Sequence, residues 1–91
     1  MVSVLTPDST RTETIRISNG RITEISFCLE PWGDVIAMPP GSSLEIVTTG
    51  LNEGQTEVYY EDQRIVFYGW NGSDSVIFRD GIRIGGSGFT T

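Results

Sequence analysis

The chain of 91 residues has a mass of 10.0 kDa and is 37% hydrophobic and 20% charged, a composition typical of one small globular domain. Its net charge of −6 argues against a protein that tracks nucleic-acid phosphates or binds anionic membranes, because both need surplus positive charge. The absence of histidine removes the commonest metal ligand and the usual general base, and a single cysteine excludes an intramolecular disulfide.

Residue types that favour strands dominate the composition. Val, Ile and Thr together number 27, whereas Ala and Leu together number five. Branching at Cβ suits a pleated sheet better than a helix. Eleven glycines and four prolines also interrupt the sequence at short intervals, so no segment supports a long helical period. We therefore predict an all-β protein, a small antiparallel barrel or sandwich of seven or eight strands.

The two ends of the chain differ in composition from its centre. Residues 1–12 are polar after Leu5 and contain Pro7, so we expect a loose N-terminal arm. This start has no basic region and only a short apolar stretch, so we expect no signal peptide and a cytoplasmic protein. Residues 85–91 are rich in glycine, and we expect a flexible tail there. A single β domain is then predicted over residues 13–84.

Within this domain, apolar residues alternate in short runs separated by turn signals. The predicted strands are Glu13–Ser18, Arg21–Leu29, Asp34–Met38, Ser43–Thr49, Gln55–Glu61, Arg64–Trp70, Ser75–Arg79 and Ile82–Ile84. The apolar residues of the first two strands fall on one face only if a three-residue loop, Ser18-Asn19-Gly20, joins them. A slip of one residue would invert the faces, so we predict a hairpin with this loop and a glycine bulge.

The last four strands are predicted to form a meander. A two-residue loop at Asp62-Gln63 pairs Glu61 with Arg64, and a four-residue loop over residues 71–74 pairs Phe67 with Phe78. A turn at Asp80-Gly81 leads into the last strand, Ile82–Ile84. One face then carries Val58, Tyr60, Ile65, Phe67, Val76 and Phe78. The other carries Glu57, Tyr59, Arg64, Val66, Tyr68, Trp70, Ile77, Arg79, Ile82 and Ile84. Since neither face is cleanly polar, the second face requires cover from the first half of the chain, a partner subunit or a ligand.

One short segment contains a spacing of glycine and proline that is known from a protein family. Gly33, Pro39 and Gly41 resemble the second motif of the cupin superfamily, G-x5-P-x-G-x2-H-x3-N. The resemblance covers residues 33–48 and implies a small jelly-roll domain that often dimerises, with Pro39 and Gly41 in a hairpin between two strands. Leu44 and Thr48 stand where the family places a metal-binding histidine and an asparagine. The resemblance therefore implies a degenerate, metal-free cupin-like domain, and we expect no cofactor.

Candidate functional residues come from the second face of the predicted meander and from the two tryptophans. Large amphipathic rings often anchor partners or ligands, and carboxylates or arginines beside them add polar contacts. We predict no catalytic or metal-binding residues, and the candidate binding residues are Trp32, Glu57, Tyr59, Arg64, Tyr68, Trp70 and Arg79. Cys28 lies in an apolar strand with no histidine to activate it, so we expect it to pack.

Two functions fit these residues. The first is a non-catalytic binding or interaction module, homodimeric through an edge strand or the aromatic meander face, with a possible small-molecule ligand and no nucleic-acid or membrane partner. The alternative is a small metal-independent isomerase or lyase that acts on a sugar-like or acidic metabolite in the barrel mouth. A carboxylate such as Glu57 would then serve as acid or base.

Overall fold

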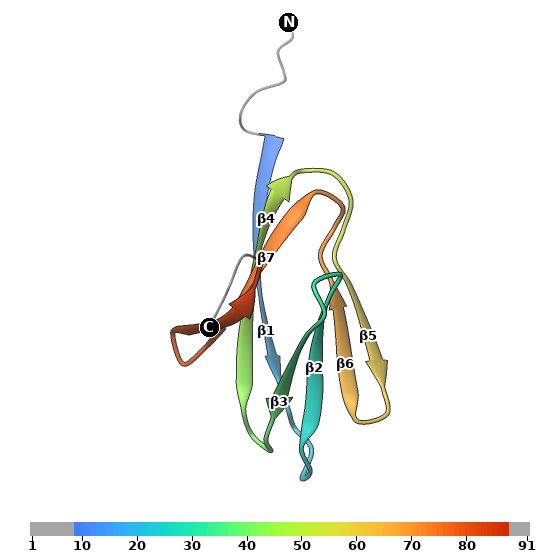
Figure 1. Ribbon diagram of the computed structural model, residues 1–91, viewed down its shortest axis with the longest axis vertical. Helices are drawn as coiled ribbons and strands as arrows, with labels where there is room; N and C mark the ends of the chain where they lie inside the picture. The colour runs from blue at the N-terminus through green and yellow to red at the C-terminus, as the bar shows by residue number, and fades with distance from the viewer. Residues whose placement is uncertain (1–8, 88–91) are drawn as a thin grey trace, which may run out of the picture.

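Eight β-strands and no α-helix make up the part of the chain that the computed structural model describes, residues 9–87. The strands are β1 (Thr10–Ser18), β2 (Ile25–Glu30), β3 (Asp34–Met38), β4 (Ser43–Leu51), β5 (Glu57–Glu61), β6 (Arg64–Tyr68), β7 (Ser73–Arg79) and β8 (Ile82–Gly86). Sheet A has the strand order β1-β4-β7-β8, and sheet B has the order β3-β2-β6-β5 (Figure 1). The prediction of an all-β chain is confirmed, but the two sheets do not close into a barrel.

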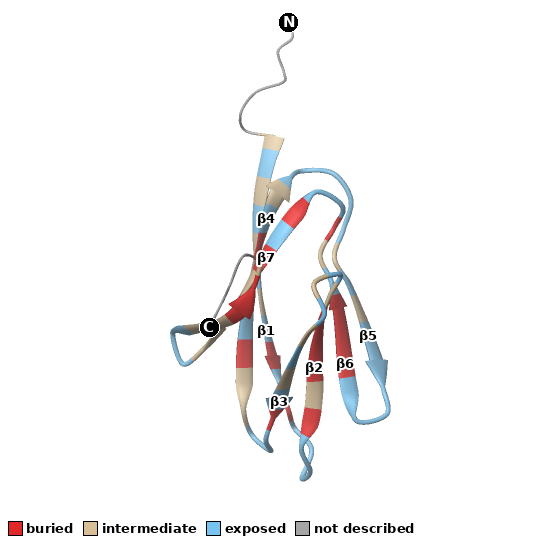
Figure 2. Ribbon diagram, in the orientation of Figure 1, coloured by how far each residue is buried: buried red, intermediate tan, exposed pale blue. Residues whose placement is uncertain are grey.

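The core lies between the two sheets. Alternate residues of each strand point inward, and the largest side chains that are fully buried come from both sheets, namely Phe27, Leu29, Met38 and Phe67 of sheet B and Leu44, Ile46 and Ile77 of sheet A. Figure 2 shows this burial along β2 and β6, the central strands of sheet B. The Phe27 and Phe67 rings lie 6.0 Å apart between centroids. The space between the sheets is therefore filled by apolar side chains.

Sheet B contains one parallel pair in an otherwise antiparallel fold. β2 runs parallel to β6, with Cys28 beside Val66 and Leu29 beside Phe67. The hairpins β2–β3 and β5–β6 complete this sheet. Both central strands have neighbours on each side and the core beneath them, which explains why β6 is buried at three successive residues, Ile65–Phe67. Continuous burial of this kind is typical of strands in the middle of a sheet.

Asn19 joins two of the connections that cross between the sheets. Its backbone N–H donates to the Ser42 carbonyl at 2.9 Å, and its own carbonyl accepts from the Gly41 N–H at 2.9 Å. The side-chain amide nitrogen donates to the carbonyls of Thr23, at 2.9 Å, and Met38, at 2.8 Å. Asn19 is only 1% exposed. This side chain therefore fastens the β1–β2 connection to the end of β3.

The predicted hairpin at Ser18-Asn19-Gly20 is wrong. β1 pairs with β4 over its whole length, with Ile17 opposite Leu44, and residues 19–24 carry the chain across to sheet B. The inward direction of the apolar residues was still correctly predicted, because Ile17, Ile25 and other alternating residues meet in the core. They meet from opposite sheets, which produces the same burial pattern as neighbours in one sheet.

Two other predicted hairpins are also wrong. The loop after β6 does not pair Phe67 with Phe78, because β6 belongs to sheet B and β7 to sheet A. The chain leaves sheet B at Gly69, where an added Cβ would lie 2.7 Å from the Ser73 Oγ. Residues 39–42 likewise connect β3 of sheet B to β4 of sheet A, so Pro39 and Gly41 lie in a crossover instead of a hairpin. By contrast, the predicted turns at Asp62-Gln63 and Asp80-Gly81 are confirmed.

The ends of the β domain differ from their predicted positions. β1 begins at Thr10, three residues before the expected Glu13, because its first residues pair with the end of β4, as Thr10 does with Leu51. β8 continues to Gly86, beyond the expected Ile84, through pairing with Val76 and Ile77. The remainder of the predicted arm and tail, residues 1–8 and 88–91, lies outside the described residues. Within residues 9–87, no helix has the length and apolar content to span a bilayer.

Candidate functional site

The β5–β6 hairpin places a group of aromatic and charged side chains on the outer side of sheet B. The two-residue turn pairs Glu61 with Arg64, Tyr59 with Val66 and Glu57 with Tyr68. Residues that face each other across a hairpin point to the same side of the sheet. We call this surface the tyrosine face, and its members are Glu57, Tyr59, Glu61, Arg64, Val66 and Tyr68. It lies opposite the core-facing side of the same strands.

The neighbouring strand β2 extends the tyrosine face. In the parallel register, Cys28 lies beside Val66 and Glu30 lies beside Tyr68. Cys28 and Val66 are 5% and 7% exposed although they lie on the outer side of the sheet, so the surrounding side chains cover them. This burial agrees with the prediction that Cys28 packs. The two residues provide an apolar floor below the more exposed aromatic rings.

A hollow of about 440 Å³ opens on the tyrosine face. Its lining residues are Glu57, Tyr59, Glu61, Val66 and Tyr68. The Tyr59 and Tyr68 rings stand edge to face, with centroids 5.7 Å apart and planes at 89°. Both remain accessible, at 49% and 40% exposure. Edge-to-face packing orients aromatic rings, so this pair offers a partner a fixed aromatic contact surface.

Two hydrogen bonds fix the polar groups of this hollow. The Tyr59 hydroxyl donates to the Glu57 Oε1 at 2.7 Å, and the Arg64 Nε donates to the Glu61 Oε1 at 2.6 Å. The hydrogen bond to Glu57, together with its negative charge, raises the pKa of Tyr59 above the usual value for a phenol. The hydrogen bond and charge of Glu61 raise the pKa of Arg64. Glu61 is thus matched by a cation, whereas Glu57 is held by a neutral phenol.

Four of the predicted binding residues therefore come together, namely Glu57, Tyr59, Arg64 and Tyr68. The two tryptophans lie beside this group. Trp32 lies in the β2–β3 turn, packs against the core, and lines a second hollow of about 310 Å³ together with Trp70 and Tyr68. Tyr68 belongs to both hollows, so it forms the border between them.

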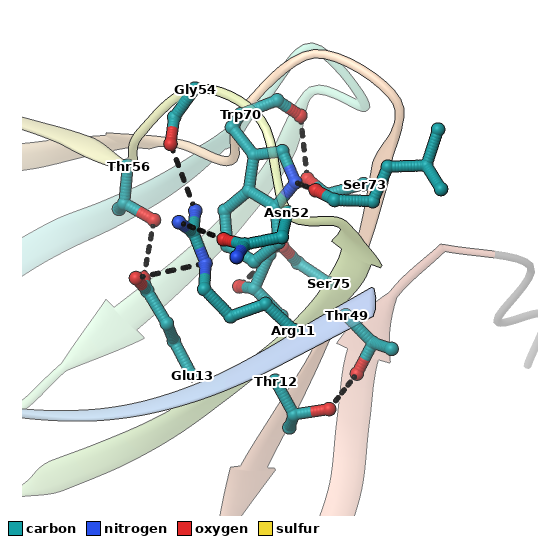
Figure 3. Close-up of polar contacts among 12 residues, drawn as sticks. Arg11, Thr12, Glu13, Thr49, Asn52, Gly54, Thr56, Trp70, Ser73 and Ser75 are labelled. Carbon is teal, nitrogen blue, oxygen red and sulfur yellow. Dashed lines mark hydrogen bonds and ion pairs between the residues drawn. The ribbon is translucent and has the colours of Figure 1, made fainter. Parts of the chain in front are cut away.

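Trp70 follows β6 and is only 3% exposed, so its ring is mainly structural. Its Nε1 donates to the Leu51 carbonyl at 2.7 Å, and the Arg11 guanidinium lies 4.0 Å from the ring centroid (Figure 3). Arg11 also donates to the Asn52 side chain and to the Gly54 carbonyl. These contacts hold the β4–β5 connection against the start of β1. A cation above an indole ring is a stabilising contact in its own right.

Arg79 lies apart from the tyrosine face. It is the last residue of β7 in sheet A, and its Nη2 donates to the Ala37 carbonyl of β3 at 2.6 Å. This hydrogen bond joins β7 of sheet A to β3, an edge strand of sheet B. The predicted meander placed Arg79 on the same face as Tyr68, but the crossover after β6 separates them.

Some members of the site were not among the predicted residues. Glu61 and Val66 line the hollow. The predicted pairing of Glu61 with Arg64 fixes the register of the hairpin, and that register places both residues on the tyrosine face. Cys28 and Glu30 join the face through the parallel pairing of β2 with β6, which no local pattern indicates. Among residues 9–87, no three Cys, Asp or Glu side chains are grouped closely enough to hold a metal ion.

Comparison with protein-family models, curated proteins and solved structures finds no match to this chain. Two exposed rings, an apolar floor and two carboxylates are suited to holding a ligand by surface contact.

Proposed function

We propose that this protein is a non-catalytic binding module and that the tyrosine face is its binding surface. The observation that carries the proposal is the hollow of about 440 Å³ with Tyr59 and Tyr68 oriented edge to face. Tyrosine rings provide large contact areas at a small cost in conformational entropy, and they are enriched where proteins bind partners. The core of the domain is already filled from both sheets, so this outer surface is free for recognition.

A panel of ligands followed by ¹⁵N-resolved NMR tests the proposal. The panel contains short peptides of positive, neutral and negative charge, together with simple saccharides. We expect the shifts caused by a binding ligand to concentrate on β5 and β6, and to disappear in Tyr59→Ser/Tyr68→Ser. Tyr60→Ser is the matched control, because Tyr60 is 78% exposed and lies outside the tyrosine face. Shifts centred on another surface would contradict the proposal.

The alternative function, a metal-independent isomerase or lyase, has less support. Fully buried Phe27, Leu29 and Phe67 occupy the space in which a barrel mouth would open. An acidic metabolite on the tyrosine face would meet the carboxylates of Glu57 and Glu61, and like charges repel. The same NMR samples distinguish an enzyme from a binding module. An enzyme would convert one of the saccharides to a new species, whereas a binding module would leave every saccharide unchanged.

We also propose that the protein forms homodimers through β1. This strand of nine residues lies at the edge of sheet A, and among the strands of residues 9–87 it pairs with β4. A long edge strand is a template for pairing with another chain. Two-fold antiparallel pairing centred on Thr14 places Thr12 opposite Arg16 of the partner and opposes no like charges. The tyrosine faces stay accessible because they lie on sheet B.

Light scattering coupled to size-exclusion chromatography tests this dimer. We expect the mass of a dimer at high micromolar concentration and that of a monomer for Thr14→Lys, which places two positive charges at the centre of the interface. The Thr14 side chain is exposed, so the substitution leaves the core intact. A wild-type protein that stays monomeric at every concentration, or a variant that dimerises equally well, would contradict the proposal.

A relation to the cupin superfamily is a further proposal. It rests on Gly33, Pro39 and Gly41, and the backbone supports a structural reason for both glycines. Their φ angles are 79° and 81°, in the left-handed region where other residues are strained. A degenerate, metal-free member with an opened jelly roll would retain these positions for their turns. The relation predicts that Gly33→Ala and Gly41→Ala each lower the melting temperature.

A further inference from the structure

We infer that β5 binds a basic strand of a partner protein, which pairs antiparallel with its outer edge and rests its side chains on the tyrosine face. This inference rests on the proposed function and names the class of partner. β5 is the last strand of sheet B, and within residues 9–87 it pairs only with β6, so its other edge carries backbone groups that no described strand pairs (Figure 1). Addition of a strand to such an edge is a common mode of peptide recognition.

The charges of β5 specify which strand would fit. Glu57, Tyr59 and Glu61 alternate onto the tyrosine face, so residues of an added strand directly opposite them would point to the same side. Arginine or lysine opposite each glutamate and an aromatic or apolar residue opposite Tyr59 would match this surface. The pattern is a basic residue, a spacer, an aromatic residue, a spacer and a second basic residue.

Of the two glutamates on β5, Glu57 is the one without a cation partner among the described residues. Within residues 9–87 it forms no ion pair, whereas Glu61 is paired with Arg64 at 2.6 Å. Glu30 and Glu57 lie on either side of Tyr68 in one row across the sheet. An arginine side chain placed above this row would therefore contact an aromatic ring between two carboxylates. Ion pairing and cation–π attraction act together in such an arrangement.

A second copy of this chain does not supply the required strand. Antiparallel pairing of β5 with itself about Tyr59 would place Glu57 opposite Glu61, and like charges in direct opposition destabilise a sheet. Of the six arginines, only Arg79 and Arg83 are four residues apart, and they lie on either side of the turn between β7 and β8. The occupant is thus a basic segment of a different protein.

Titration with a labelled peptide, Thr-Arg-Thr-Tyr-Thr-Arg-Thr, tests the inference by fluorescence anisotropy at low salt. We expect Glu57→Gln/Glu61→Gln to weaken binding about tenfold, as expected for the loss of two exposed ion pairs. The matched control is Glu45→Gln, which removes an exposed carboxylate from sheet A. We expect binding unchanged in this control and weakened for the wild type as the salt concentration rises.

A second peptide separates strand addition from simple charge attraction. N-methylation of alternate residues on the edge that faces β5 removes the backbone donors and keeps both arginines, so strand addition predicts that binding is lost. If the methylated peptide binds as well as the parent, or if Glu57→Gln/Glu61→Gln binds as tightly as wild type, the inference is overturned. If the parent peptide does not bind while another ligand still shifts β5 and β6 in NMR, the inference fails and the binding-module proposal stands.

Discussion

Replacement of Asn19 by alanine removes the side chain that fastens two crossovers between the sheets. Its amide donates to the Met38 carbonyl, which is buried, and to the Thr23 carbonyl, and its Oδ1 accepts from the Arg21 N–H. In the variant, the Met38 carbonyl loses this donor in a site that excludes water. A buried polar group without a partner costs about 1–3 kcal/mol, and the two part-buried partners recover hydrogen bonds with water. We therefore expect a loss of about 2–3 kcal/mol in the free energy of unfolding.

Thermal and urea denaturation followed by circular dichroism measure this loss. For a domain of this size, it corresponds to a fall of about 10–20 °C in the melting temperature. Asn71→Ala is the matched control, since Asn71 is exposed in the β6–β7 connection, and we expect it to stay within about 0.5 kcal/mol of wild type. A similarly small change in Asn19→Ala would refute the role assigned to this side chain.

Three further substitutions test other parts of the structure. Gly86→Ala should lower the free energy of unfolding, measured by thermal denaturation, by at least about 2 kcal/mol, because Gly86 has φ 112° and an added Cβ would clash with a backbone carbonyl of β7. Gly20→Ala is the control: its added Cβ meets nothing within 4 Å, so we expect a neutral or slightly stabilising effect. Trp70→Phe should lower the free energy of unfolding by about 1–2 kcal/mol, because the hydrogen bond from the indole to the Leu51 carbonyl of β4 is lost. Urea denaturation measures this change. Glu57→Gln should lower the pKa of Tyr59 toward its usual value in a spectrophotometric titration, because the hydrogen bond to the Glu57 carboxylate and its negative charge, which raise that pKa, are both lost. An unchanged pKa of Tyr59 would contradict this contact.

The strands themselves could be predicted from the sequence because alternation and turn chemistry are local signals. Asp34–Met38 occupies its predicted range, and the turns at Asp62-Gln63 and Asp80-Gly81 join the strands that were expected. In both turns a residue adopts positive φ, Gln63 at 64° and Asp80 at 53°, which suits a tight hairpin connection. Local sequence therefore determined the elements and their shortest connections.

The assignment of strands to sheets could not be predicted in this way. A strand that turns back on its neighbour and a strand that crosses to the opposite sheet bury the same alternating residues, so Ile17 and Ile25 meet in the core in either case. The decisive features are non-local. They include the buried hydrogen bonds of Asn19 and the parallel pairing of β2 with β6.

The candidate site also combines residues that local sequence could place with residues that only non-local pairing could place. The register of one hairpin was sufficient to place Glu57, Tyr59, Arg64 and Tyr68 on one face. Arg79 was assigned to that face only through the incorrect β6–β7 hairpin. Cys28 was expected to pack, but its position beside Val66 required knowledge of the parallel register.

Hydrogen–deuterium exchange of the β5 amides tests most directly whether this edge is the binding element. In the free protein, the amides of Glu57–Glu61 that point away from β6 should exchange rapidly, since none of the strands between residues 9 and 87 lies on that side of β5. We predict that the arginine-containing peptide slows their exchange and leaves that of β1 unchanged. Exchange in β5 that is insensitive to the bound peptide, or protection that arises along β1 instead, would contradict the account.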